Sequence, residues 1–97
     1  MAIQVSIDMI AKDGKYEDLY KWYSDHIAGT RSFKGNISIE TAREIDSPNH
    51  VFFVEKWESA EDFQRYLEWR TAEGVIDELL ELTSEPPVFR FYEFIGV

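Results

Sequence analysis

The sequence contains no cysteine. Disulfide bonds and thiolate chemistry are therefore excluded, and with them the class of small secreted domains that disulfides hold together. No stretch approaches the roughly 20 apolar residues that a helix needs to span a bilayer. The first residues have neither the basic start nor the long apolar run of a signal peptide. We therefore expect a cytoplasmic protein that does not enter membranes.

Basic residues are scarce: ten lysines and arginines stand against nineteen aspartates and glutamates, for a net charge of -9. A surface this acidic repels phosphate backbones and anionic membranes, so neither nucleic acid nor a membrane is an expected partner. The acidic stretches Glu55 to Glu58 and Glu78 to Glu85 are interpreted as solvated faces that keep the protein in solution.

Motifs for metals, phosphates and nucleophilic serines are also missing. The two histidines, His26 and His50, have no partner at the spacing of a metal site. The five glycines form no phosphate-binding loop, and no serine lies in a nucleophile elbow. The sequence therefore predicts a protein without a metal or an organic cofactor.

Hydrophobic and aromatic residues, in contrast, are plentiful. Of the 97 residues, 44% are hydrophobic and 15% are aromatic, so the chain is globular rather than disordered. Its length predicts one domain, residues 1–97, with a thin core, because a chain of this size buries only about 60–65% of its surface. The aromatic side chains must fill that core, or line a pocket or an interface.

The spacing of the apolar residues predicts an alternation of strands and helices. Period two over residues 2–10 indicates a strand, and a helical period follows over residues 15–29. Further strands are predicted over residues 36–44, 50–57 and 88–95, and further helices after Ser59 and over residues 75–82. In the second strand, Ile37, Ile39 and Thr41 are expected on one face. The order β-α-β-β-α-β predicts an α+β, ferredoxin-like fold with one antiparallel sheet.

Helices on one side of such a sheet leave its other face bare. Phe52, Val54 and one apolar row of the last strand would then meet water, and a patch of this kind is unfavourable for a monomer. We therefore expect a homodimer that pairs these faces. Ser6 and Asp8 fall on the same face and are predicted to line the dimer interior.

The stretch from Glu55 to Phe63 resembles the E-x-W-x-S-x-x-x-F signature of the antibiotic biosynthesis monooxygenase family. Thr30-Arg31, Gly35, Tyr66-Leu67, Trp69-Arg70, Gly74 and Pro86-Pro87 extend the resemblance over nearly the whole chain. The family consists of dimeric α/β barrels. The resemblance implies oxygen chemistry without flavin or metal, in which a phenolic or hydroquinone ring is oxidised to a quinone and the substrate itself is the reductant.

Two branches of the family differ from this sequence at functional positions. A haem-degrading branch depends on Asn, Trp and His at positions that correspond to Ile7, Tyr66 and Ile76, so the resemblance does not extend to haem chemistry. Another set of relatives carries His where Tyr66 stands. Neither departure allows a catalytic base to be assigned by analogy.

Tyr66 and Arg70 are the first candidates for catalysis, because they lie four residues apart on the helix face that carries Phe63. A guanidinium could hold a phenolate, and a tyrosine hydroxyl could relay a proton. The alternative is that Tyr66 belongs to the core while Arg70 extends to an acidic partner on the surface.

His26 is the third catalytic candidate, because histidine is a natural base at neutral pH. Its alternative role is a charged cap at a helix end. Tyr23, Trp57, Phe63 and Trp69 are candidates for substrate contacts, although packing accounts for Trp57 better than chemistry does.

The sequence thus predicts a cofactor-independent monooxygenase acting on a small aromatic or polyketide-like substrate. Two alternatives remain open, since one fold supports several functions. The first is a ligand-binding or accessory dimer without chemistry, and the second is another enzyme on the same barrel, such as an isomerase or a dehalogenase.

Overall fold

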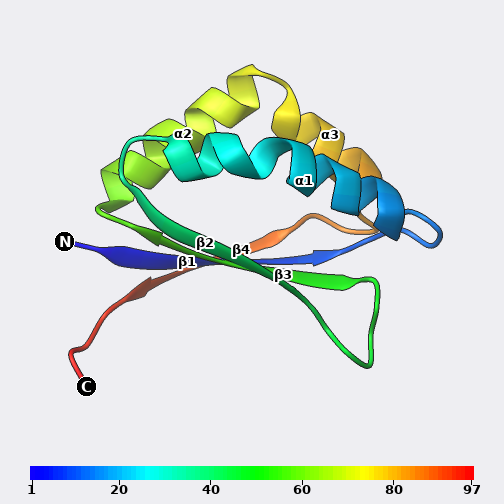
Figure 1. Ribbon diagram of the computed structural model, residues 1–97, viewed down its shortest axis with the longest axis horizontal. Coiled ribbons are helices and arrows are strands. Elements are labelled where there is room, and N and C mark those ends of the chain that lie inside the picture. Colours follow the sequence, from blue (N-terminus) through cyan, green and yellow to red (C-terminus); the bar gives the residue numbers. More distant parts are fainter.

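A computed structural model describes all residues 1–97 of the chain. Four strands form one antiparallel sheet in the order β2-β3-β1-β4. The strands are β1 (Ile3–Ile10), β2 (Asn36–Arg43), β3 (His50–Trp57) and β4 (Val88–Glu93), and the helices are α1 (Tyr16–Ser32), α2 (Ala60–Ala72) and α3 (Val75–Leu82). All three helices lie on one side of the sheet (Figure 1). The predicted α+β, ferredoxin-like fold is confirmed.

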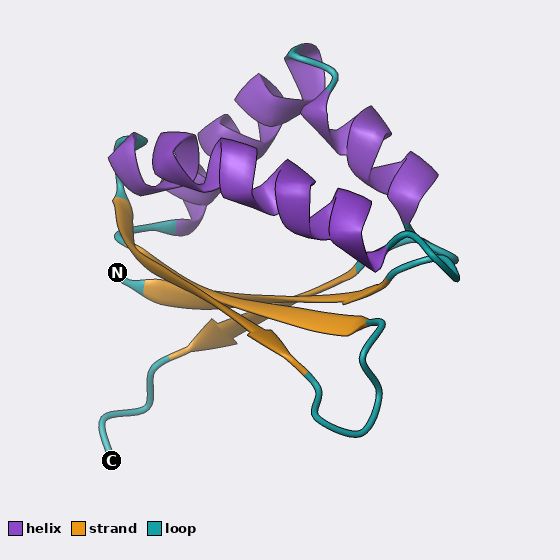
Figure 2. Ribbon diagram, turned by 45° about the vertical axis from the view of Figure 1, so that its right-hand side comes forward, coloured by secondary structure: helices purple, strands orange, loops and turns teal.

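The alternation of side chains along the two central strands decides where the core lies. Val5 and Met9 of β1 and Val51 and Phe53 of β3 point towards the helices and are buried. Trp57 at the end of β3 is completely buried among them. The core is therefore a single layer of side chains between the sheet and the helices, the two layers that Figure 2 shows.

Helix α1 extends three residues further than the sequence pattern predicted. Gly29, expected to end the helix, lies inside it, and a Cβ atom there would come within 2.9 Å of the Arg70 guanidinium. Glycine at this position lets α1 and α2 approach closely. The turn that follows places Gly35 at a φ of +93°, where a side chain would collide with Asp62.

Helix α2 begins directly after Ser59, which caps it. The Ser59 hydroxyl accepts a hydrogen bond from the Asp62 amide at 3.1 Å and donates one to the Asp62 carboxylate at 3.0 Å. This arrangement satisfies an amide at the helix start that would otherwise lack a partner. None of the helices is long and apolar enough to cross a membrane.

Strand β2 departs from the predicted pattern. A register shift between Asn36 and Ser38 interrupts the alternation, so Ile37 is 52% exposed, whereas Ile39 is buried in the core. The expectation that Ile37 and Ile39 share a face was therefore wrong, because a β-bulge inserts an extra residue at this point.

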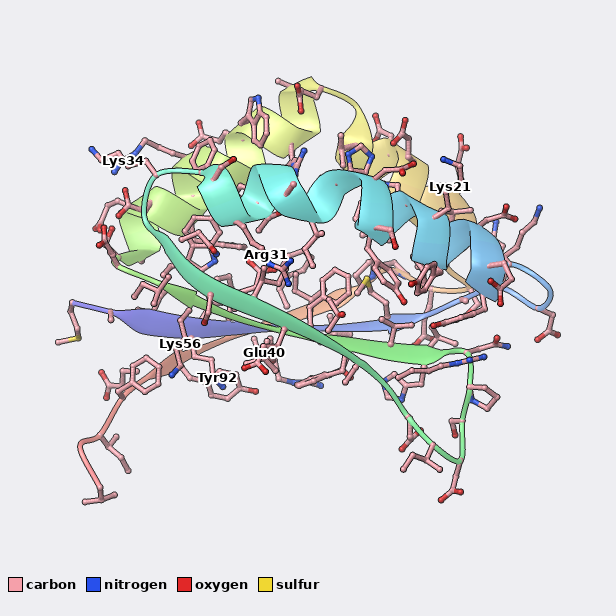
Figure 3. The ribbon with its side chains drawn as sticks, in the orientation of Figure 1. Lys21, Arg31, Lys34, Glu40, Lys56 and Tyr92 are labelled. Atoms are coloured by element: carbon pink, nitrogen blue, oxygen red, sulfur yellow. The ribbon has the colours of Figure 1, made fainter.

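The sheet face away from the helices is uncovered. Glu40, Lys56 and Tyr92 project from it, away from the helices (Figure 3). Phe52 and Val54 lie on this face, and Val88, Tyr92 and Phe94 at its β4 edge are 41%, 43% and 50% exposed. Beside them, Asp8 forms ion pairs with His50 and Arg90. The bare apolar patch expected from the sequence is present, with an ionic cluster at one end.

Candidate active site

A cavity lies between the sheet and the helices, in the middle of the core layer. Its volume is about 40 Å³, which is room for about three water molecules and less than an aromatic ring occupies. Fourteen of its eighteen lining residues are hydrophobic. The four others are His26, Thr30, Glu55 and Arg70. Sites for small molecules usually have apolar walls with a few polar groups.

Tyr66, Thr30 and Arg70 form a hydrogen-bonded network at the cavity wall. The Arg70 Nε donates to the Tyr66 hydroxyl at 3.1 Å, and that hydroxyl lies 2.6 Å from Thr30 Oγ1. Both hydroxyl oxygens accept from Arg70, and either hydroxyl can donate the hydrogen bond between them. Arg70 also donates through Nη2 to the His26 carbonyl at 2.6 Å and to Thr30 Oγ1 at 3.3 Å.

Arg70 combines features of the two roles considered for it. The residue is only 4% exposed and lines the cavity, and its Nη1 lies 3.6 Å from a carboxylate oxygen of Glu73, whose side chain is 45% exposed. Its bonds to α1 also tie that helix to α2. Arg70 therefore has a structural function, and its guanidinium charge remains beside the cavity.

Glu55 is a site residue that the sequence analysis missed. It is 2% exposed and lines the cavity, so its assignment to a solvated acidic face was wrong. The physical reason is the alternation of β3, which places Glu55 on the helix side with Phe53 and Trp57 and places Lys56 on the open face. The same alternation, applied to Glu55, would have revealed it from sequence.

The environment of Glu55 favours its neutral form. The Trp57 indole donates to Glu55 Oε1 at 2.9 Å, and Oε2 has no hydrogen-bond partner in the chain. Burial raises the pKa of Glu55 to about 7, although the Trp57 hydrogen bond and the charge of Arg70 act in the opposite direction. A carboxyl group with this pKa exchanges protons at neutral pH.

His26 and Tyr23 reach the cavity from α1. His26 is not a helix-end cap, because α1 continues for six residues beyond it. Its side chain is 31% exposed, and its Nε2 lies 3.4 Å from a Glu78 carboxylate oxygen. The Tyr23 hydroxyl lies 3.1 Å from that of Tyr16, and burial raises the pKa of Tyr23. Tyr23 therefore contributes an uncharged side chain to the cavity wall.

The four aromatic candidates for substrate contacts divide into two pairs. Tyr23 and Phe63 line the cavity, but Trp57 and Trp69 do not. The Trp57 ring is completely buried against Tyr66 and Phe63, and Trp69 stacks on Phe33 at 5.2 Å. The structure thus places these two predicted contact residues outside the cavity wall, with their rings occupied in packing.

The cavity wall also contains Trp22, Ile7 and Ile76. Trp22, which the sequence analysis did not assign to the site, lines the cavity and donates to the Val75 carbonyl at 3.2 Å. Ile7, Tyr66 and Ile76, which correspond to the functional positions of the haem degraders, all line the cavity. No group of three His, Asp or Glu side chains is arranged to hold a metal ion.

The family model for antibiotic biosynthesis monooxygenases matches residues 3–76 of the chain. The protein belongs to this family. Its match to the E-x-W-x-S-x-x-x-F signature therefore reflects membership.

Solved structures agree with this membership at the level of the fold. A protein from Shewanella oneidensis, SO0527, is 26% identical with a TM-score of 0.84, over 94% of this chain and 88% of that chain. A conserved protein from Methanosarcina mazei is 17% identical with a TM-score of 0.88, over 96% and 92%. SnoaB from Streptomyces nogalater, a cofactor-independent oxygenase, is 12% identical with a TM-score of 0.85, over 99% and 95%. Among curated protein sequences, none matched.

Proposed function

We propose that this monooxygenase-family protein oxidises a phenolic or hydroquinone-type substrate with molecular oxygen, without a cofactor, in the cavity between sheet and helices. One observation carries the proposal. An almost wholly apolar cavity holds a buried guanidinium, Arg70, hydrogen-bonded to a half-buried phenol, Tyr66. This pair provides positive charge and a hydroxyl where little water can compete.

The chemistry requires an electron-rich anion. A phenolate can transfer an electron to oxygen more readily than a phenol, and Arg70 would stabilise that anion. For a monooxygenation, one phenol and one O₂ give one quinone and one water, so the ring supplies all the electrons. Tyr66 would orient the ring oxygen or relay a proton through Thr30, since the two hydroxyls lie 2.6 Å apart.

The substrate needs more room than the closed cavity provides. Tyr23 and Ile27 line both this cavity and an open cleft of about 390 Å³ between α1 and β2. Movement of these two side chains would join the spaces and admit a ring. Arg43 and Tyr16 line the open cleft, with the Arg43 guanidinium 3.7 Å from the Tyr16 ring centre. This cation would attract an anionic or phenolic compound to a protein that is acidic elsewhere.

The test is oxygen consumption by the metal-free protein with a panel of hydroquinones and naphthols, followed by ¹⁸O₂ labelling of the quinone. We expect turnover above the rate in buffer, and its loss in Ile76→Phe, which fills the cavity. Leu80→Phe is the matched control, because Leu80 lies on the same helix but is 45% exposed. Ring binding without oxygen consumption would contradict the proposal and favour a ligand-binding protein.

We further infer that two copies pair through the open sheet face. The support is the exposed apolar patch around Phe52, Val54 and Tyr92, which a second copy would remove from water. The ionic cluster of Asp8, His50 and Arg90 would fix the register of the two faces. Family members share the same architecture, and pairing is common among small domains with one bare sheet face.

A further inference from the structure

We propose that Glu55 is the catalytic base of this site, and that it takes the phenolic proton of the substrate before oxygen reacts. This inference rests on the proposed function for its reaction, but it assigns a role to Glu55 that the sequence candidates Tyr66, Arg70 and His26 do not fill. The geometry points to Glu55 because it is the one carboxylate on the cavity wall.

Glu55 is held in position with one oxygen free. Trp57, two residues along the same strand face, donates its indole N–H to Oε1 at 2.9 Å. Oε2 accepts no hydrogen bond from the chain, and it is not sealed off, because Thr83 Oγ1 is the only buried side-chain polar atom without a partner. A free acceptor in an apolar cavity is where a ligand hydroxyl would donate.

The charges around the cavity favour proton transfer to Glu55. The titratable groups that line the same cavity are Arg70 and Tyr66 of α2 and His26 and Tyr23 of α1, and the charge of Arg70 acts on Glu55. The cavity residues of α3 and of the other strands carry no titratable group. Burial raises the pKa of Glu55 to about 7, which is suited to accepting a proton at neutral pH.

The transfer itself creates no new charge in the cavity. The phenol O–H bond breaks, its electron pair stays on the phenol oxygen, and the proton forms an O–H bond on the Glu55 carboxylate. The negative charge thus passes from carboxylate to phenolate, beside the Arg70 guanidinium in both states. Glu55 later returns the proton to the oxygen atom that leaves as water, which closes the cycle with one O₂ consumed.

His26 is less suited to this role. It is part of the cavity wall, but its Nε2 lies beside the Glu78 carboxylate, and a third of its side chain is exposed. A base there would exchange its proton with solvent. Glu55 is enclosed, so its proton stays with the substrate pair.

A merely structural role for Glu55 predicts something different. If Glu55 only accepts the Trp57 hydrogen bond, Glu55→Gln keeps that bond through its amide oxygen and leaves the chemistry unchanged. If Glu55 is the base, Glu55→Gln folds like the parent but loses about 100-fold or more in kcat. In addition, Trp57→Phe removes a bond that lowers the Glu55 pKa, so the rising acid limb of the pH profile should move up by about one unit.

The decisive experiment uses a nitrophenol, which is coloured when ionised and does not need oxygen. We expect the parent to bind it near pH 8, where Glu55 is ionised, as the phenolate, with a proton taken up by Glu55, and Glu55→Gln to bind it as the neutral phenol; the nitrophenol is chosen to be mostly neutral in buffer at that pH. Carboxyl ¹³C NMR of the ligand-free parent should show one glutamate titrating near pH 7, assigned by its loss in Glu55→Gln or its shift in Glu55→Asp if the first variant does not fold.

The outcomes separate this inference from the proposed function. Ionised nitrophenol in the parent, together with no oxygen consumption for any hydroquinone, would support the base and reject the oxygenase. Oxygen consumption with the same pH profile and kcat in Glu55→Gln would support the oxygenase and overturn the base. A Glu55 carboxyl that titrates below pH 5 would also overturn it.

Discussion

The two faces of the sheet hold carboxylates in opposite electrostatic situations. Glu55 on the helix side is enclosed by apolar walls, and burial raises its pKa to about 7. Asp8 on the open face also experiences an upward effect of burial, but hydrogen bonds from His50 and Arg90 outweigh it and lower its pKa. The difference shows that the face of a strand, rather than residue type, decides whether an acid becomes a reactive group or part of an ion pair.

The helix side and the open side of the sheet also differ in the kind of partner that suits them. The helix side closes over a small cavity with a few fixed polar groups. The open side presents an apolar patch beside charged side chains, without any covering element. A small ligand suits the first surface and a protein surface suits the second.

The largest expected effect concerns the open face. Phe52→Asp places a charge in the centre of the exposed patch, so the dimer should be lost or the protein should become insoluble. Sedimentation at micromolar concentration should give about twice the chain mass for the parent and the single-chain mass for the variant. Tyr20→Asp, an exposed position on α1, is the control and should remain dimeric. A soluble, monomeric parent would contradict the pairing.

The second prediction compares the pH dependence of stability on the two faces. Glu55 has a folded-state pKa raised from 4.5 to about 7, so folding takes up a proton between these values. The contribution of this protonated carboxyl to folding stability is fully present below about pH 4.5 and is lost as the pH rises through 7. Across this window Glu55→Gln should gain roughly 3 kcal/mol relative to the parent. Denaturant unfolding at pH 4.5 and pH 8 measures the difference.

Asp8 should behave with the opposite sign. Its lowered pKa stabilises the fold above its ordinary value of 3.8, and that stability is lost as the pH falls through the folded-state pKa. The stability of Asp8→Asn should therefore approach that of the parent only at very low pH. Because the pKa of His50 is raised by Asp8, both comparisons must use differences between variant and parent. Equal pH dependence of the two variants would remove the contrast between the faces.

The third prediction tests Tyr66 as a relay. Tyr66→Phe removes a hydroxyl that bonds Thr30 and Arg70 but keeps the ring in place. We expect kcat to fall by about 100-fold and KM to change little, because proton transfer matters in the transition state. Tyr20→Phe is the matched control on α1. A change in KM alone would assign Tyr66 to substrate packing.

The fourth prediction concerns Arg70. Arg70→Ala should weaken binding of a phenolate ligand by roughly 1.5–3 kcal/mol, the scale of a charge-assisted hydrogen bond. The variant also loses the bond to the His26 carbonyl, so its folding must be verified by thermal unfolding. Arg70→Lys keeps the charge and should restore part of the affinity. If a folded Arg70→Ala variant binds the ligand like the parent, Arg70 serves only to connect α1 and α2.

The smallest effect is expected from haem. Ile7, Tyr66 and Ile76 replace the functional residues of the haem degraders at the cavity wall, and the cavity has no room for a porphyrin. Titration with haem should therefore produce no Soret shift and no change in thermal stability. Stoichiometric binding, followed by ring cleavage with a reductant, would contradict this expectation.

Local sequence patterns determined the fold. Period two in β1, the apolar run of β3 and the order of the elements predicted the ferredoxin-like sheet, because such patterns depend on residues close in the chain. The signature around Trp57 predicted the family, because it too is a pattern of residues close in the chain. The placement of Tyr66 and Arg70 on one inner face also followed from helical spacing.

Tertiary structure alone decided the chemistry of the cavity. Thr30 and Arg70 are forty residues apart, and only the close approach of α1 and α2 at Gly29 brings them into one network. Trp57 and Trp69 were indistinguishable from wall residues by sequence, yet packing directs their rings elsewhere. The pKa of Glu55 depends on how completely other elements exclude water from it, and exclusion of water is a property of the assembled layers rather than of any one segment.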